Sequence, residues 1–140
     1  MSVNQIKSQL LASLNAMGTL KAAYGYETGN PSGNYPFATL TLRDGDGEYA
    51  DTSRNLRRHG FTIRVYQEQS KEGQGVSQAE VIAIDVIDEL YAHLDAVTTL
   101  SGVCKYVRPV DYRALYENRE LDTRVLEINV DAFELSSSGR

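Results

Sequence analysis

Strict alternation of apolar and polar residues near the C-terminus is the feature that most constrains how this chain can fold. Every second residue between Leu126 and Ala132 is apolar, and the residues between them are mostly polar. Because successive side chains of an extended chain point to opposite faces, this period of two predicts a strand with one buried face over residues 126–133. The other elements must then supply a sheet and a cover for that face.

Three further segments are predicted as strands. Alternation is visible in Pro36–Arg43 and in Phe61–Glu68, and a third apolar segment, Gly102–Val110, is ended by Pro109. The segment from Tyr24 to Tyr35 is rich in Gly, Asn and Pro, which predicts a loop. A short helical turn is predicted over residues 112–118.

Apolar residues at helical spacing mark two amphipathic helices. The first begins near Val3 and its apolar face comprises Val3, Ile6, Leu10, Leu14 and Met17. The second is predicted from Ser77 to Val97, with Ser77 and Glu80 at the spacing of a capping box. No Gly or Pro interrupts this second segment.

The predicted order is therefore α-β-β-α-β-β, which indicates an α+β fold. We expect a mainly antiparallel four-stranded sheet with both helices packed on one face. The link between the first two strands, Asp44–Gly60, is longer than a usual hairpin connection and is predicted as a long loop. Residues 1–140 are predicted to form one domain, with a frayed polar tail over residues 136–140.

Composition excludes several classes of protein. The chain has 14 Lys and Arg against 19 Asp and Glu, a net charge of −5, which argues against a protein that reads DNA sequence. No apolar run approaches the roughly 20 residues of a membrane span, so no membrane partner is expected. A single cysteine, Cys104, excludes an internal disulfide and a zinc cluster of thiolates.

The sequence does not match the known metal-binding and catalytic motifs that parts of it resemble. The acidic run from Asp44 resembles the start of a calcium loop, but its sixth position is Tyr49 and its twelfth is Asn55. A line of Asp85, Glu89 and His93 on the second helix has metal-ligand spacing, although the solvated side of a helix explains it better. Nucleophile elbows and phosphate-binding loops are absent from the sequence. We predict no catalytic residue, no metal site and no cofactor.

Charge segregation in the link after the first strand is the strongest functional signal. Residues 44–51 hold four of the 19 acids and no base, and the rest of the chain has 15 acids against 14 bases, so the excess negative charge is concentrated in these eight residues. Bases follow immediately, and the predicted interface comprises Asp44, Asp46, Glu48, Asp51, Arg54, Arg57 and Arg58. Two interpretations remain open: a solvated loop that protects an edge strand, or an arm that meets complementary patches on neighbouring subunits. Tyr is enriched at interfaces, which adds Tyr24, Tyr26 and Tyr49.

The whole pattern resembles the tail terminator (tail completion) proteins of long-tailed bacteriophages. The resemblance is carried by the N-terminal amphipathic helix, the Tyr35-Pro36-Phe37-Ala38 start of the first strand and the long acidic hairpin link. It continues through residues 57–66 (RRHGFTIRVY), the capped helix ending at residues 86–90 (VIDEL) and the final strand at residues 124–130 (RVLEINV). These features span nearly the whole chain.

The resemblance implies a non-enzymatic structural protein of the virion, made and assembled in the cytoplasm of the bacterial host. Such a protein forms a homohexameric ring that caps the tail tube, ends its polymerisation and joins it to the head connector or stopper protein. Genomic DNA passes through the ring without specific binding. The alternatives are another neck component, such as a head-completion or stopper protein, and a small metal- or ligand-binding module that uses the acidic 44–51 segment.

Overall fold

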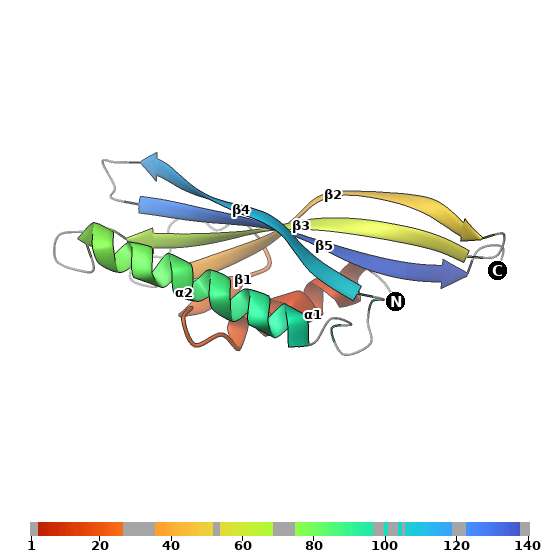
Figure 1. The fold of residues 1–140 in the computed structure, drawn as a ribbon, viewed down its shortest axis with the longest axis horizontal. Coiled ribbons are helices and arrows are strands. Elements are labelled where there is room, and N and C mark those ends of the chain that lie inside the picture. The colour runs from red at the N-terminus through yellow and green to blue at the C-terminus, as the bar shows by residue number, and fades with distance from the viewer. Residues whose placement is uncertain are drawn as a thin grey trace.

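The computed structural model describes residues 3–26, 36–51, 54–68, 75–96, 100, 104, 106–118 and 123–137. The elements follow in the order α1 (Val3–Asn15), β1 (Ala22–Tyr24), β2 (Phe37–Asp51), β3 (Arg54–Glu68), α2 (Gly75–Ala96), β4 (Tyr106–Asn118) and β5 (Thr123–Ser137). The strands form one sheet in the order β1-β2-β3-β5-β4. Figure 1 shows a long, twisted sheet in which β5, the last strand in sequence, lies between β3 and β4.

The prediction of a four-stranded, mainly antiparallel sheet in the order α-β-β-α-β-β is wrong. The sheet has five strands and is mixed, because β1 pairs in parallel with the start of β2, with Ala22 opposite Phe37. The other three pairings are antiparallel. The missed strand has three residues, too few for a period of two to stand out from its surroundings.

The predicted long loop at Asp44–Gly60 is wrong as well. Residues 44–51 continue β2 and residues 54–60 begin β3, so the two strands form one long hairpin in which only residues 52 and 53 lie between them. Residues 112–118, predicted as a helical turn, belong to β4 and pair with β5. Residues 136 and 137 of the predicted frayed tail lie in β5, and residues 138–140 are outside the described residues.

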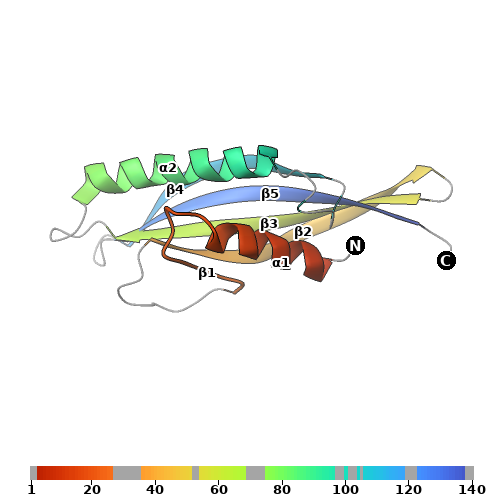
Figure 2. The same cartoon turned by 90° about the horizontal axis from the view of Figure 1, so that it is seen from below.

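Both predicted helices form, with ends displaced by up to a few residues, and they pack on the same face of the sheet (Figure 2). Their inward residues Ile6, Leu10, Val86 and Leu90 join the strand residues in one cluster of buried side chains. The strand contribution comes from alternate positions: Ala38, Leu40, Phe61, Ile63, Val65, Leu126, Ile128, Val130 and Ala132. Burial of this apolar face accounts for the alternation seen in the sequence.

Two polar contacts fix α2 against the N-terminal segment. The Glu89 carboxylate accepts hydrogen bonds from the Thr19 hydroxyl at 2.7 Å and from the backbone N–H groups of Gly18 and Thr19. The His93 ring nitrogen Nε2 lies 2.9 Å from the Ser13 hydroxyl of α1. These residues, considered above as a metal-ligand line, hold two parts of the fold together.

The opposite face of the sheet is not covered by either helix in the two views (Figures 1 and 2), and we call it the open face. At one end the sheet also extends beyond both helices. We call this extension the arm; it consists of residues 44–51 of β2, 54–60 of β3 and 131–137 of β5. The arm contains most of the charged residues singled out in the sequence.

Candidate functional site

A β-bulge builds the base of the arm. Leu42 of β2 lies opposite Phe61, and Asp44 lies opposite Gly60, so Arg43 is an extra residue between two paired positions. A bulge of this kind re-aims side chains and increases local twist. Because of this bulge, the side chains of Arg43 and Asp44 both lie on the open face. There Arg43 contacts the carboxylates of Asp44 and Asp131, which form part of a charged cluster.

The centre of that cluster is Asp131 of β5, whose side chain is only 7% exposed. Its Oδ1 accepts a hydrogen bond from Arg43 Nη2 at 2.8 Å and another from Arg58 Nη1 at 3.1 Å. Arg43 also donates to the backbone carbonyl of Phe61 at 3.2 Å. A buried carboxylate needs such partners, because leaving its charge unpaired away from water costs several kcal/mol.

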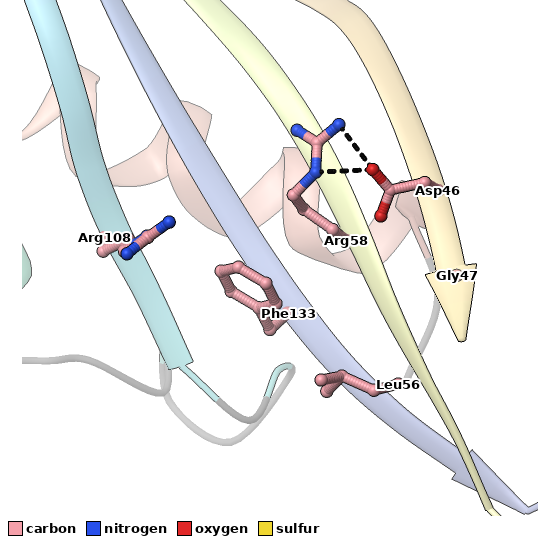
Figure 3. A pocket seen from close by; sticks show the side chains of 6 residues that line it. All are labelled: Asp46, Gly47, Leu56, Arg58, Arg108 and Phe133. Carbon is pink, nitrogen blue, oxygen red and sulfur yellow. Dashed lines mark hydrogen bonds and ion pairs between the residues drawn. The ribbon is translucent and has the colours of Figure 1, made fainter. Parts of the chain in front are cut away.

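Arg58 extends the cluster to the exposed edge of the arm. Its guanidinium contacts Asp46 Oδ2 at 2.9 and 3.0 Å and Asp44 Oδ1 at 3.1 Å, in addition to Asp131 (Figure 3 shows the bonds to Asp46). The hydrogen bond from Arg58 holds the pKa of Asp44 below its usual value, and the bonds to Asp46 and Asp44 raise the pKa of Arg58. Asp44 and Arg58 are therefore charged at neutral pH, and the cluster contains two arginines and three aspartates.

Gly60 makes room for the cluster. A Cβ at this position would overlap the Arg43 guanidinium and the Asp44 carboxylate. Gly60 lies in the row between Asp44 on β2 and Asp131 on β5, so the absence of a side chain lets Arg43 cross β3 to reach Asp131. Glycine is normally unfavourable inside a strand, and here it has a specific packing function.

A second charged group continues along the open face toward the other end of the sheet. Glu127 of β5 is bonded by Arg64 of β3 at 3.3 Å and by Arg113 of β4 at 3.2 Å. Between the two groups, the Asn129 amide donates to Asp111 at 2.6 Å, and its oxygen accepts from the Thr62 hydroxyl at 3.0 Å. Glu127, Asn129 and Asp131 of β5 are thus each bonded to side chains of neighbouring strands.

A hollow of about 410 Å³ lies on the open face where the arm begins (Figure 3). It is lined by Asp46, Gly47, Leu56, Arg58, Arg108 and Phe133. The Phe133 ring stacks on Tyr106 with centroids 4.5 Å apart, and the Arg108 guanidinium lies 5.6 Å from the Phe133 centroid. Among the described residues Arg108 makes no ion pair, unlike the other open-face arginines.

The helix-side face of the arm carries a separate charged contact. His59 Nε2 lies 2.9 Å from Glu134 Oε1, and both side chains are largely buried. Arg57 lies 3.8 Å from the same carboxylate oxygen and is about half exposed. The arm is therefore held by polar contacts on both of its faces.

Several of the predicted interface residues lie close together, and their contacts are with other residues of the same subunit. Asp44 and Asp46 bond Arg58 inside the subunit, and Arg57 is near Glu134. The side chains of Glu48, Asp51, Arg54 and Tyr49 lie outside the described residues; by register, Asp51 is opposite Arg54 and Glu48 is opposite Leu56. Tyr24 is in β1 with its ring against Phe37, and Tyr26 is 64% exposed.

Sequence reasoning missed Arg43, Gly60, Asp131, Arg108 and Phe133. The signal for Asp131 is the polar half of the alternation in residues 126–133, to which no function is assigned from the sequence. In the structure this half supplies carboxylates to arginines of β2, β3 and β4.

Three further findings on the described residues concern metal binding, membrane spans and the cysteine thiol. No three His, Cys, Asp or Glu side chains among them are grouped to hold a metal ion. In the part of the chain that the structure describes, no helix is long and apolar enough to span a membrane. Burial raises the pKa of the Cys104 thiol to about 11, so the thiolate needed for nucleophilic chemistry is scarce at neutral pH.

Comparison with known proteins relates the fold of this chain to a solved structure, but not its sequence to a known family. No family model matches the chain, and no curated protein matches its sequence. The fold is similar to that of a chain in a solved structure described as "Virion of native gene transfer agent (GTA) particle", with a TM-score of 0.54. The similarity covers 94% of this chain and 95% of that chain, at 14% sequence identity. The two chains thus share a fold over almost their full lengths.

Proposed function

We propose that this protein is a non-enzymatic structural component of a phage-like virion, and more specifically a tail terminator. In this role it forms a homohexameric ring that caps the tail tube, ends its polymerisation and joins it to the head connector or stopper protein. The observation that carries the proposal is the shared fold with a chain of the gene transfer agent particle, over 94% of this chain. The sequence resemblance described above supports the terminator role within the virion.

The electrostatics of the open face support this role. Its described charges cancel, with five arginines (Arg43, Arg58, Arg64, Arg108 and Arg113) against five acids (Asp44, Asp46, Asp111, Glu127 and Asp131). A surface without excess positive charge does not hold DNA phosphates, because non-specific DNA affinity comes mainly from phosphate neutralisation. Such a face suits the lining of a channel through which DNA must slide.

The arm supports contact with neighbouring proteins. It extends past both helices (Figure 2), and ion pairs on its open face and the His59–Glu134 contact on its helix side stiffen it. A projecting element that is already ordered loses little conformational entropy on binding. The tail tube protein and the next subunit of the ring are the partners that we propose for it.

The deciding experiment measures termination directly. The purified protein is added to the polymerising tail tube protein of the same virus, and tube lengths are measured by electron microscopy. We expect shorter tubes with one capped end, and light scattering of the protein alone or on tubes should give the mass of six subunits. Unchanged tube lengths, with no protein bound to tube ends, would overturn the proposal.

The shared fold also fits another neck component, such as a head-completion or stopper protein. That component would bind isolated connectors or heads and leave tube length unchanged, so the same assay separates the two functions. A metal-binding module at residues 44–51 has less support, because Asp44 and Asp46 lie on a strand and bond arginines. Addition of calcium should therefore leave the melting temperature unchanged.

A further inference from the structure

The sheet has two long edges that lack a partner strand among the described residues. At one edge β1 pairs only with residues 37–39 of β2, so that residues 40–51 have a strand on one side alone. At the other edge the whole of β4, Tyr106–Asn118, pairs only with β5. Natural proteins usually protect such edges, since unpaired N–H and C=O groups accept another strand.

Among the described residues, four of the seven exposed large hydrophobic side chains lie on these two edges, and the other three are Tyr26 and, on α2, Val81 and Ile84. Large hydrophobic side chains that are more than one-third exposed include Leu42 on β2 and Tyr106, Val110 and Tyr112 on β4. An edge that displays apolar groups is poorly protected against pairing. The pattern indicates that both edges are covered in the assembled protein.

Strand direction decides which edges can meet. Each neighbour in the series β2, β3, β5 and β4 is antiparallel to the next, so β2 and β4 run in opposite directions. A second copy rotated about an axis along the strands places its β2 beside β4 of the first copy, as an antiparallel pair. Repetition of that contact uses both edges of every subunit and closes a ring when the rotation closes.

The rows of residues across the sheet match at such a junction. One row runs Asp44, Gly60, Asp131 and Arg108, and the next apolar row runs Leu42, Phe61, Val130 and Pro109. A rotation without axial shift continues each row into the next copy. Arg108 then lies beside Asp44 of the second copy, and Leu42 of the second copy lies beside Pro109 and the exposed Val110.

Charge favours this junction over the two-fold alternatives. The cluster of Arg43, Arg58, Asp44, Asp46 and Asp131 has two positive and three negative groups, a net charge of −1, and its acids Asp44 and Asp46 are 52% and 68% exposed. On the β4 side Arg108 has no carboxylate partner among the described residues. Pairing β2 with β2 would bring two negative clusters together, whereas β2 with β4 brings opposite charges together.

We propose that residues 40–46 of β2, which include the base of the arm, dock on residues 106–112 of β4 of a second copy of this chain, with Arg108 bonding Asp44 or Asp46 across the junction. The proposal rests on the ring proposed above and specifies its subunit interface. Main-chain hydrogen bonds between the edges supply affinity, and the matched charged and apolar rows fix the register.

The test measures assembly by light scattering over a concentration series. Arg108→Ala should raise the concentration at which rings half-form by about tenfold, as expected for the loss of an interfacial charge pair. Lys21→Ala removes an exposed positive charge beside the start of β1, at the opposite end of β2 from Asp44, and should change this concentration less than about twofold. The variant that combines Asp44→Asn and Asp46→Asn with Arg108→Ala should lose less assembly free energy than the sum of the losses measured for Arg108→Ala alone and for the two aspartate changes alone. Circular dichroism checks that each variant folds.

A cross-linking experiment provides a second readout that tolerates small losses of stability. In a Cys104→Ser background, Arg108→Cys is combined with Asp44→Cys or with Asp46→Cys, and at least one combination should give a ladder of disulfide-linked subunits up to six. The combination of Arg108→Cys with Lys21→Cys should give none. These variants address the edge contact without relying on charge.

The outcomes separate the interface from the proposed function. Wild-type rings that are insensitive to Arg108→Ala and give no ladder would overturn the edge-to-edge interface and leave the terminator proposal standing. A protein that stays monomeric at every concentration and on tubes would overturn the docking of a second copy, whereas the tube-length assay still decides termination. Rings that respond to Arg108→Ala and cross-link support the interface, even if tube lengths do not change.

Discussion

The two halves of the sheet are stabilised in different ways. Under the helices, residues such as Ile63 and Ile128 are completely buried among other apolar side chains. On the open face of the arm, Asp131 is almost as buried, but what covers it are the guanidinium groups of Arg43 and Arg58. One half of the molecule thus excludes water with apolar groups and the other with paired charges.

The difference shows how a strand can extend beyond the hydrophobic core. Strand stability depends on cross-strand contacts between side chains, and these contacts can be apolar or charged. In the arm, β3 lies between β2 and β5, so arginines of β3 and β2 reach carboxylates on both neighbours. Three strands that share ion pairs remain ordered where no helix covers them. Four experiments test this difference between the two halves.

The largest effect is expected in the helix-covered half. Ile128→Asp places a charge at a position with no solvent exposure, opposite Ile63, and should destabilise the subunit by at least about 4 kcal/mol, enough to unfold many domains. Ile84→Asp on the exposed side of α2 is the control and should cost about 1 kcal/mol. Urea unfolding followed by circular dichroism measures both. A native-like Ile128→Asp variant would show that β5 is not packed as described.

Removal of the central carboxylate tests the arm. Asp131→Ala leaves Arg43 and Arg58 without their shared acceptor and should lower the free energy of unfolding by about 2 kcal/mol. The loss is not larger because water can still solvate both guanidinium groups, which are partly exposed. Asp111→Ala, an exposed carboxylate on β4 bonded to Asn129, should cost well under that. Equal losses in the two variants would mean that the paired charges contribute little to the arm.

Two glycines of the β2–β3 hairpin, Gly60 and Gly47, test whether the charged cluster needs a position without a side chain. Gly60→Ala should cost about 1 kcal/mol, because the new Cβ displaces Arg43 from Asp131. Gly47→Ala in the same hairpin meets its nearest atom, Arg57 Cγ, at an ordinary 3.5 Å and should be neutral or slightly stabilising. Thermal melts of the two variants give the difference. If Gly60→Ala melts at the same temperature as Gly47→Ala, Gly60 is not required for the Arg43 contact.

The smallest effect concerns pH and the contact between α2 and the segment after α1. Hydrogen bonds from Thr19 are the largest cause of the lowered pKa of Glu89. A carboxylate whose pKa is lowered by folding adds stability above its unfolded pKa, and this stability is lost as pH falls through the folded pKa. Glu89→Gln should therefore flatten the fall in stability below about pH 5, whereas Asp88→Asn, on an exposed neighbour, should change the slope less. Identical slopes would contradict a stabilising role for the Glu89 contacts.

The helix-covered half was largely predictable, because its apolar residues repeat with the period of the element that they occupy. Alternation over residues 126–133 located the centre of β5, and three-and-four spacing located both helices. The three residues of β1 carried no usable period. Residues 112–118 gave no clear strand pattern, and their pairing with β5 determined their conformation.

The arm was not predictable by the same reasoning. Its alternating residues are Asp, Gly and Arg, so a search for apolar periodicity reads the segment as a loop. The acids and bases singled out by their segregation do belong to the arm, but Asp131, which joins them, is 73 residues from Arg58. Only the strand order of the sheet brings these groups together, and no local pattern reports that order.

The position of β5 has a consequence for how the chain folds. The β2–β3 hairpin is local and can form early, but β5 pairs with β3 only after the C-terminal residues are available. The final strand enters the interior of the sheet, between β3 and β4, and does not add to an outer side. On the ribosome, β3 therefore lacks one of its neighbours until residues 123–137 have emerged. The sheet, including the arm and the β4 edge, is therefore completed in a single step, when β5 enters between β3 and β4.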